Sequence, residues 1–149
     1  MKETLRLHPP GPLLLPRRPS ESCTVAGFAI PTETQIFVNV WAMHRDPEVW
    51  ENPLEFQPER FLKESTKWDY SGNDHRYMPF GSGRRICPGI SLMERMVPYA
   101  IATFVHMFKW RLPEGSNLDL SEKCGIVLKK ETSLIVIPSP RFSEPELYH

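Results

Sequence analysis

The chain has 149 residues, and its 18 basic and 18 acidic residues give a formal net charge of zero. Because the charges cancel, the composition gives no indication of a nucleic-acid-binding or anionic-membrane surface, and no apolar run is long enough to span a bilayer. The 16 prolines predict short elements with many connections.

The three cysteines, Cys23, Cys87 and Cys124, lie far apart and form no C-x-x-C pair. An odd, sparse set indicates a reducing compartment rather than a disulfide framework, and the histidines do not fall at zinc-site spacing. We therefore expect Cys23 and Cys124 to be ordinary residues, and we treat Cys87 separately because of its neighbours.

The first half of the chain is predicted to hold short elements. Residues 1–8 favour a helix that ends before Pro9 and Pro10, and the prolines of residues 9–19 favour an extended segment. The runs "CTVAGFAI" and "TQIFVNVWA", joined by "PTET", predict a strand pair. Asp46 followed by Pro47 predicts a helix that Asn52 and Pro53 stop after a turn or two. Residues 53–80 have no sustained period, which predicts a long irregular segment.

A change of period follows Cys87. Apolar residues recur every three or four positions from Met93 to Phe108 and predict a core-packing helix, which Pro98 should kink. The runs "CGIVLKK" and "TSLIVIP" predict two short strands, and a proline-containing tail follows.

The stretch "PFGSGRRICPG", residues 79–89, surrounds Cys87 with features that favour an anionic sulfur. Pro88 presets the first turn of the following helix, so that Cys87 lies where free N–H groups and the helix dipole favour negative charge. Gly81, Gly83 and Gly89 permit backbone conformations closed to other residues and let a flat partner come close. This pattern suits a thiolate ligand of a metal.

The two arginines of this stretch, Arg84 and Arg85, match carboxylates such as the two propionates of haem, and Phe80 supplies an aromatic surface beside the sulfur. A thiolate next to haem iron favours O–O cleavage. Three alternatives stay open on local chemistry alone: a plain strand-to-helix turn, a phosphate-binding loop and a redox or catalytic cysteine. The phosphate-loop patterns G-x-x-x-x-G-K-[ST] and G-x-G-x-x-G are both absent.

The spacing of five residues carries a resemblance to a known family. Phe80, Gly83, Arg85, Cys87 and Gly89 form F-x-x-G-x-R-x-C-x-G, which resembles the haem-binding signature of the cytochromes P-450. Two further motifs stand in the family's order. The "ETLR" stretch supplies Glu3 and Arg6 as E-x-x-R, and "PERF" supplies Arg60; together they resemble the family's Glu-Arg-Arg network.

The resemblance covers essentially the whole chain and implies a mainly α fold with small β-sheets. It implies that residues 1–149 are the C-terminal part of a single cytochrome P-450 domain, a fragment rather than an autonomous domain. The expected elements are the end of the E-x-x-R helix, a β-hairpin, the meander, the haem-binding loop, a long proximal helix and a C-terminal β-hairpin. The motifs are most similar to the plant microsomal branch, and "SEKCGIVLKK" is loosely similar to a subgroup containing terpenoid hydroxylases.

The resemblance also implies roles for single residues. Cys87 would be the axial thiolate ligand of the haem iron and the catalytic residue, with Phe80 and Gly81 beside the cofactor. Arg85 would bind one haem propionate, and Arg17 occupies a place where the family often has a second propionate partner. The residues expected to border the haem on the substrate side are Leu13, Leu14, Leu15, Ile126 and Val127.

The activity that the resemblance implies is that of a monooxygenase of class EC 1.14. The full enzyme would insert one oxygen atom from O₂ into a small lipophilic substrate, a plant secondary metabolite. Its cofactor would be haem b, iron protoporphyrin IX, and NADPH would supply electrons indirectly through NADPH–cytochrome P-450 reductase. An N-terminal anchor, absent from this chain, would hold it at the cytoplasmic face of the endoplasmic reticulum membrane, and the fragment alone is expected to be inactive.

Two departures from the family pattern leave alternatives open. Glu33 stands in "PTET" where plant relatives commonly have glycine, which puts the turn type in doubt, and no oxygen-activating helix is present in the chain. One alternative is a haem-thiolate synthase or isomerase that uses no O₂, although the uninterrupted signature argues against it. The other is a non-catalytic truncated product that binds no haem.

Overall fold

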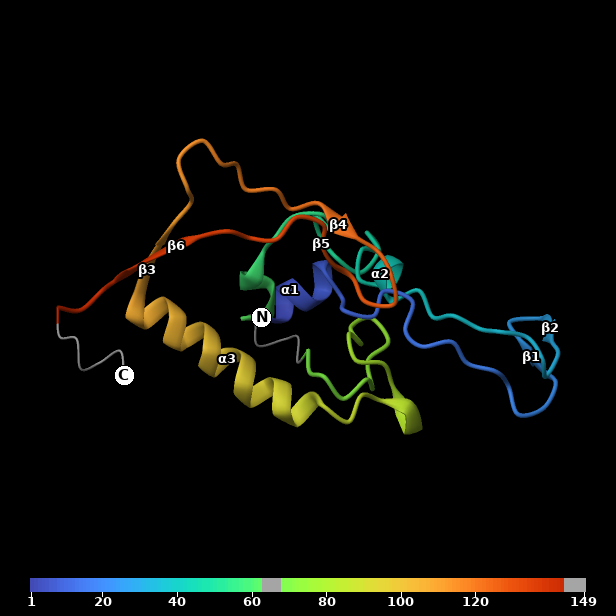
Figure 1. The fold of residues 1–149 in the computed structure, drawn as a ribbon. Coiled ribbons are helices and arrows are strands. Elements are labelled where there is room, and N and C mark those ends of the chain that lie inside the picture. Colours follow the sequence, from blue (N-terminus) through green and yellow to red (C-terminus); the bar gives the residue numbers. More distant parts are fainter. Residues whose placement is uncertain (63–67, 144–149) are drawn as a thin grey trace. The chain divides into compact units, whose positions relative to one another are not determined.

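The computed structural model describes residues 1–62 and 68–143. These residues group into two compact units, the first holding Met1–Cys87 and Cys124–Leu128, and the second holding Pro88–Lys123 and the chain from residue 129 on. In chain order the elements (Figure 1) are α1 (Lys2–Leu7), β1 (Cys23–Val25), β2 (Phe28–Ile30), α2 (Val40–Met43), the 3-10 helices η1 (Pro58–Phe61) and η2 (Gly83–Arg85), α3 (Ile90–Met107), β3 (Phe108–Arg111), β4 (Glu122–Lys123), β5 (Lys129–Lys130) and β6 (Ile137–Pro140).

The N-terminal helix is confirmed as α1. It ends at His8, whose N–H donates to Thr4 O at 2.7 Å, and the prolines that follow prevent its continuation. The expectation of a fully extended segment after it is wrong in one place. Leu14 has a positive φ of 51° and donates its N–H to Gly11 O, which makes a turn there. Beyond this turn, Arg17 pairs with Ile36 in an isolated antiparallel bridge.

The predicted strand pair forms in a different place. Strands β1 and β2 both lie within the first run, "CTVAGFAI", and pair antiparallel with Cys23 opposite Ile30. Ala26 and Gly27 form the two-residue connection, with φ of 50° and 84°, and this geometry matches the twist of the strands. The second run contributes only the bridge at Ile36 and then turns into α2, because Asn39 Oδ1 accepts the N–H of Ala42 at 3.0 Å.

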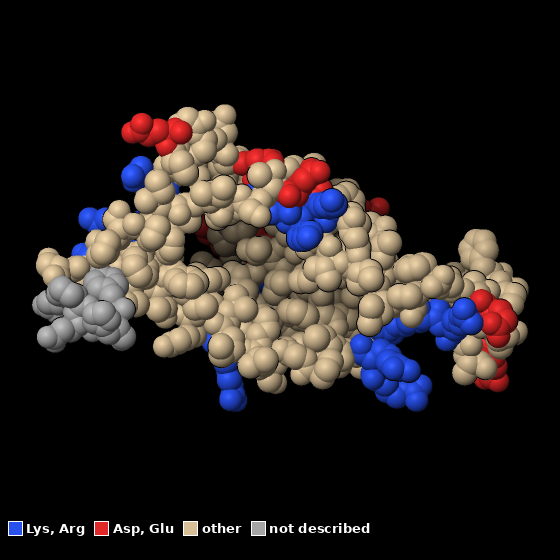
Figure 2. Space-filling view, in the orientation of Figure 1, with Lys and Arg blue, Asp and Glu red and all other residues tan. Residues whose placement is uncertain are grey.

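The turn at Glu33, which the sequence left in doubt, closes without glycine: Thr34 N–H donates to Pro31 O at 3.0 Å, and Glu33 keeps a negative φ. Next to it the chain carries both charge signs side by side (Figure 2), and Arg18 Nη1 lies 3.1 Å from Glu33 Oε2.

The short helix predicted after Asp46 is present only as a single turn. Asp46 accepts the N–H of Glu48 on its side chain and that of Trp50 on its carbonyl, which makes a single helical turn. Asn52, at a positive φ of 45°, and Pro53 then end it. The long irregular segment is confirmed in its described residues and contains one short element, η1, on "PERF".

Aromatic side chains replace regular secondary structure in the core of the first unit. The buried apolar residues are Leu7, Val40, Trp50, Trp68, Tyr70, Tyr77 and Met78. Trp50 and Trp68 stack with ring centroids 4.7 Å apart, and Tyr77 meets both rings edge-on at 6.2 Å. Interlocked rings of this size order the loops between α2 and the cysteine loop.

The second unit contains the predicted long helix, α3, with Pro98 inside it. The expectation of a core-packing helix is wrong in this chain, because no residue of α3 is buried. The two C-terminal strands are also placed differently. The C-terminal part of "CGIVLKK" forms β5, which pairs with β4, and the end of "TSLIVIP" begins β6, which pairs with β3. No helix among residues 1–62 and 68–143 has both the length and the apolar character that crossing a membrane requires.

Candidate functional site

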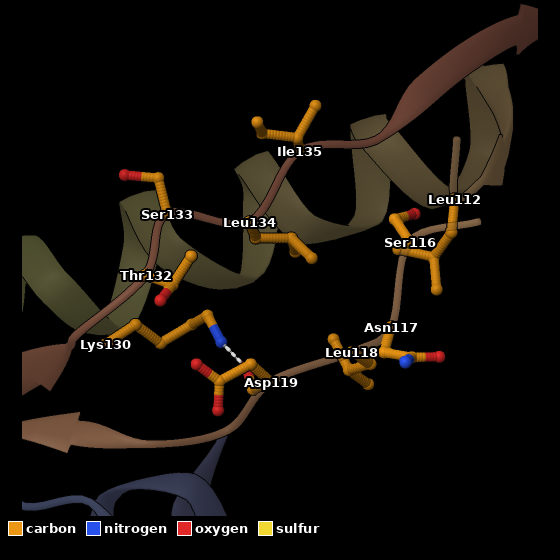
Figure 3. Close-up of a pocket in the computed structure, with 10 residues that line it drawn as sticks. All are labelled: Leu112, Ser116, Asn117, Leu118, Asp119, Lys130, Thr132, Ser133, Leu134 and Ile135. Atoms are coloured by element: carbon orange, nitrogen blue, oxygen red, sulfur yellow. Dashed lines mark hydrogen bonds between the residues drawn. The ribbon is translucent and has the colours of Figure 1, made fainter. Parts of the chain in front are cut away.

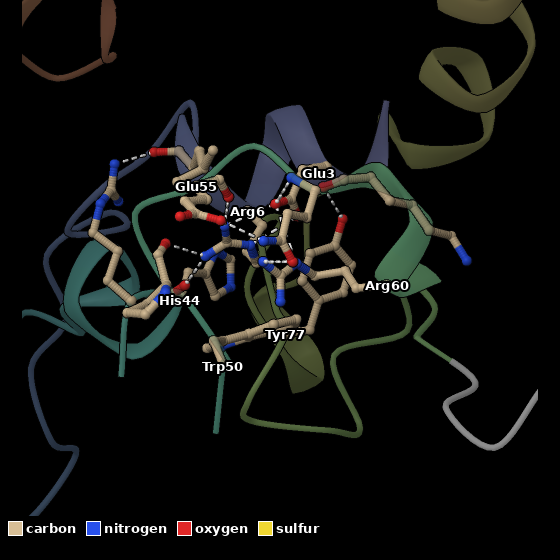
Figure 4. A network of polar contacts seen from close by, with 12 residues as sticks. Glu3, Arg6, His44, Trp50, Glu55, Arg60 and Tyr77 are labelled. Carbon is tan, nitrogen blue, oxygen red and sulfur yellow. Dashed lines mark hydrogen bonds and ion pairs between the residues drawn. The ribbon is translucent and has the colours of Figure 1, made fainter. Parts of the chain in front are cut away.

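A buried ion pair on α1 is the centre of the first unit. Glu3 and Arg6 are 1% and 0% exposed. Arg6 Nε and Nη2 each donate to one carboxylate oxygen of Glu3, both at 2.8 Å (Figure 4). A planar guanidinium and a carboxylate one helical turn apart permit this two-bond arrangement.

The remaining donors of Arg6 reach three carbonyl oxygens of irregular chain. Nη1 donates to His44 O at 2.7 Å and to Pro53 O at 2.8 Å, and Nη2 donates to Glu55 O at 3.1 Å. A buried charge is tolerated only when its hydrogen-bonding groups are satisfied in this way. Arg6 therefore fixes the path of residues 44–55.

Glu3 also binds the segment that carries "PERF". Glu3 Oε1 accepts the N–H of Gln57 at 2.9 Å and lies 3.2 Å from Arg60 Nε. Burial raises the pKa of Glu3, but hydrogen bonds from Arg6 and Gln57 and the two positive charges outweigh burial and lower the pKa below its usual range. The structure thus confirms the expected network of Glu3, Arg6 and Arg60, with a charged carboxylate.

Two further residues of this core were not singled out by sequence reasoning. His44 is fully buried, and its ring stacks on Tyr77 with centroids 5.3 Å apart. Met78 N–H donates to His44 Nε2 at 3.0 Å, and the Tyr77 hydroxyl donates to Lys2 O at 3.0 Å. Burial is the main cause that lowers the pKa of His44 to about 4, and burial likewise raises the pKa of Tyr77 above its usual range. A lone histidine after an apolar run gives no sequence signal for such a role.

The cysteine loop begins directly after Met78. Gly81 N–H donates to Met78 O, and Cys87 N–H donates to Phe80 O, both at 3.0 Å. Phe80 packs edge-on against Tyr70 at 5.5 Å. Gly81 has a φ of 78°, a conformation that favours glycine. The loop therefore has an anchored backbone, while Cys87 is a free, exposed thiol.

Two of the predicted binding residues meet at Gly81. A side chain added at Gly81 would contact Arg17 Nη2 at 3.7 Å, Leu14 Cδ1 at 3.5 Å and the carbonyl oxygen of Arg85 at 3.9 Å. Arg17 is half-buried, and the side chain of Arg85, in η2, is exposed. The structure thus brings Arg17 and Leu14 to the cysteine loop and leaves the Arg85 guanidinium in solvent.

Gly72, in the meander, touches the same loop from another segment. Its φ is 71°, and an added Cβ would overlap Gly81 O and lie 2.8 Å from Ser82 Cα. Only a residue without a side chain fits between these backbones. The sequence "SGN" indicates a turn at Gly72, but it gives no sign that the turn lies against the backbone of Gly81 and Ser82.

The residues expected on the substrate side are mostly exposed. Leu13 and Leu15 are 42% and 72% exposed, and Ile126 and Val127 are 85% and 55% exposed. Leu128 N–H donates to Pro10 O at 2.8 Å, which ties the segment holding Ile126 and Val127 to the chain just before Leu13.

A shallow pocket in the second unit lies apart from these residues in the sequence (Figure 3). Leucine side chains such as Leu112, Leu118 and Leu134 line it, and Lys130 Nζ donates to the backbone oxygen of Asp119. Its single acidic and single basic side chain form no catalytic pair, so it is not a candidate active site.

Comparison with solved structures identifies the class of fold. The chain superposes on a zebrafish cytochrome P-450, solved with abiraterone, with a TM-score of 0.79 and 32% sequence identity, covering 93% of this chain and 31% of that one. A second zebrafish structure, with progesterone, gives a TM-score of 0.77.

Sequence comparison identifies the family. The cytochrome P-450 family profile matches residues 1–137, and the chain belongs to this family. It is 52% identical over 146 residues to a probable (S)-N-methylcoclaurine 3'-hydroxylase of Coptis japonica, covering 96% of this chain and 30% of that protein. It is 50% identical over 142 residues to a flavonoid 3',5'-hydroxylase of Campanula medium, covering 94% and 27%. The chain thus spans about 30% of the length of the relatives it matches.

Family membership implies a haem cofactor, and the residues present fit one. Cys87 offers a free, exposed thiol, and Arg17, whose guanidinium lies beside Gly81, offers a cation for a carboxylate. The resemblance to a terpenoid-hydroxylase subgroup stays a prediction, because the relatives named above act on N-methylcoclaurine and flavonoids.

Proposed function

We propose that residues 1–149 are the C-terminal, haem-binding part of a plant haem-thiolate monooxygenase. The observation that carries this proposal is the free thiol of Cys87 on a loop whose backbone is fixed by the Cys87 N–H bond to Phe80 O at 3.0 Å. A rigid loop holds a single sulfur at one position, as an axial ligand requires. The family relatives are hydroxylases, which favours oxygen insertion over the alternative synthase or isomerase activity.

The proposal gives a separate role to each of the residues at and beside the cysteine loop. Cys87 would be the thiolate ligand, and haem held by it would supply the O₂ chemistry that thiolate donation favours. Arg17 and Arg85 would pair with the propionates, Phe80 would lie beside the sulfur, and Gly81 would leave room for the ring. The Leu13–Leu15 segment and the exposed Ile126 and Val127 present an apolar surface to a small lipophilic plant metabolite.

The remaining parts of the proposal concern the complete polypeptide, meaning the protein of which this chain forms the C-terminal part. It receives electrons from NADPH through a reductase and is anchored in the endoplasmic reticulum membrane by a segment outside this chain. The isolated 149-residue chain has no monooxygenase turnover, because one wall of a haem pocket does not exclude water.

The test is the ferrous–CO absorption spectrum of the complete polypeptide. We expect a Soret band at the thiolate-ligated position, and we expect Cys87→His to abolish it. Cys124→Ser is the matched control, since Cys124 is also a free, exposed thiol and its loss should leave the band unchanged. A band that survives Cys87→His refutes the ligand assignment, and a colourless polypeptide after reconstitution with hemin refutes haem binding.

A further inference from the structure

His44 is a buried titratable residue that the proposed function leaves without a task. It is 0% exposed and follows α2 directly. Its carbonyl oxygen accepts a hydrogen bond from Arg6, and its ring accepts the N–H of Met78, at the start of the cysteine loop. These contacts raise the question of what a buried imidazole does between them.

The main chain of His44 is held from the core side. Arg6 Nη1 donates to His44 O at 2.7 Å, and Arg6 is itself fixed by its two bonds to Glu3. On the other side, Tyr77 stacks on the imidazole with an interplanar angle of 26° (Figure 4). The ring therefore has a fixed position and a fixed plane.

The imidazole in turn holds the backbone at the start of the cysteine loop. Met78 N–H donates to His44 Nε2 at 3.0 Å, and Met78 O accepts the N–H of Gly81. Phe80, two residues after Met78, accepts the N–H of Cys87 on its carbonyl oxygen. A series of hydrogen bonds thus runs from Arg6 through His44 and Met78 into the cysteine loop.

Only one protonation state of His44 permits this series. A neutral imidazole has one acceptor nitrogen, whereas an imidazolium carries N–H groups at both nitrogens and accepts nothing. Burial disfavours the charged ring, as do the positive charges of Arg6 and Arg45, while the backbone carbonyls of Leu5 and Arg6 favour it. Burial prevails, so the ring is neutral at neutral pH, and the Met78 N–H at 3.0 Å from Nε2 requires the tautomer whose proton is on Nδ1.

We propose that His44 is a positioning residue that fixes the start of the cysteine loop by accepting the Met78 N–H, and so couples the Glu3–Arg6 core to the backbone of Cys87. For its effect on a bound ligand this inference rests on the proposed function. The coupling itself is a property of this chain's backbone and is measured without haem.

The test is amide hydrogen exchange in the complete polypeptide, with the rates of Met78 and Cys87 divided by that of Trp50. Trp50 N–H is bonded to Asp46 O at 2.8 Å and does not touch His44 Nε2, so it reports general opening of the same unit. We expect His44→Phe, which keeps a ring but loses the acceptor, to raise both ratios about tenfold. His44→Gln, whose amide oxygen can accept near the position of Nε2, should restore much of the protection.

Val40→Ala is the matched control, because Val40 is equally buried in α2 but bonds no residue of the loop. It should raise all three rates together and leave both ratios unchanged. The proposal is overturned if His44→Phe leaves the ratios unchanged, if Val40→Ala changes them as much, or if Met78 responds and Cys87 does not. Failure of the proposed function shows separately, as a wild-type polypeptide without the thiolate-type CO band.

Discussion

The two units of the chain differ in which of their elements contain buried residues. In the first, side chains from α1, α2 and irregular segments enclose a charged pair completely, with Glu3 and Arg6 1% and 0% exposed. In the second, the longest helix among the described residues, α3, is 18 residues long and carries an apolar stripe but has no buried residue. Regular secondary structure and burial are therefore independent here.

The contrast between the units shows which structural property each kind of sequence pattern indicates. The stripe on α3 reports a local property, the face of a helix that carries apolar residues, and does not say what covers that face. The core around Arg6 is built from residues 38 to 57 positions apart in the chain, which no local period reveals. This contrast between the two units is tested by making the same kind of substitution in each of them and comparing the loss of stability.

The largest effect is expected for the arginine at the centre of the first unit. Arg6→Met removes the two-bond partner of the buried Glu3 carboxylate and leaves only Arg60 to offset its charge, so it should lower the free energy of unfolding of the complete polypeptide by about 3–5 kcal/mol. The counterpart in the second unit is Arg141, which is exposed and donates to Phe108 O at 3.4 Å. Arg141→Met should change stability by less than about 0.5 kcal/mol.

Urea denaturation followed by tryptophan fluorescence measures both changes, because Trp50 and Trp68 lie in the core. Equal effects of the two substitutions would contradict the contrast between the units. A double change that also removes Glu3, as Glu3→Gln with Arg6→Met, should recover part of the loss, since no charge then remains buried.

A second effect, of about 3 kcal/mol, is expected from pH. Folded His44 stays neutral down to its pKa of about 4, whereas unfolded histidine takes up a proton near pH 6.5. The unfolded state therefore binds more protons in this window, and stability should fall as the pH falls from 6.5 to 4 and level off below.

Urea midpoints between pH 4 and 8 measure this slope in the wild type and in His44→Gln, which does not titrate. The wild type should be steeper over the window by the contribution of one proton. A slope that His44→Gln leaves unchanged would show that another group is responsible.

The smallest effect is the difference in stability expected between alanine substitutions at two glycines with nearly the same φ. Gly72 in the first unit and Gly115 in the second have φ of 71° and 73°, but only Gly72 has neighbours where a Cβ would be placed. Gly115→Ala should cost about 1–2 kcal/mol through left-handed strain alone. Gly72→Ala should cost about 1–3 kcal/mol more, because Ser82 and the Gly81 carbonyl must move.

The melting temperatures of the two alanine variants measure this difference. Variants of equal stability would mean that the backbone of the cysteine loop accommodates an alanine at position 72 without strain. In that case the loop is less firmly held than the contacts of Gly72 indicate.

Local signals predicted those parts of the fold whose cause lies within a few residues. Pro9 and Pro10 end α1, Pro88 precedes α3, and the spacing of Phe80 to Gly89 marked the cysteine loop. The hairpin was misplaced because Ala26 takes a positive φ, which is rare for alanine and gives no turn signal beyond the adjacent Gly27.

The site could be predicted only where the family motif names the residues. Glu3, Arg6 and Arg60 were expected as a network, and the structure places them within hydrogen-bonding distance. His44 and Gly72 were missed because their roles depend on main-chain atoms of Met78 and Gly81, and backbone partners leave no trace in side-chain identity. The end of the turn after Asp46 was predicted from Asn52 and Pro53, but only a single turn forms before them.

The wide separation of the partners of Glu3 has a consequence for synthesis on the ribosome. Its ion-pair partner Arg60 lies 57 residues further along the chain. At about 5–20 residues per second, the ribosome needs about 3–11 s to add them. During that time the backbone partners of Arg6 at residues 44, 53 and 55 are added one after another, and Arg60 comes last. We therefore expect α1 to stay solvated at first and to dock fully only after "PERF" has emerged.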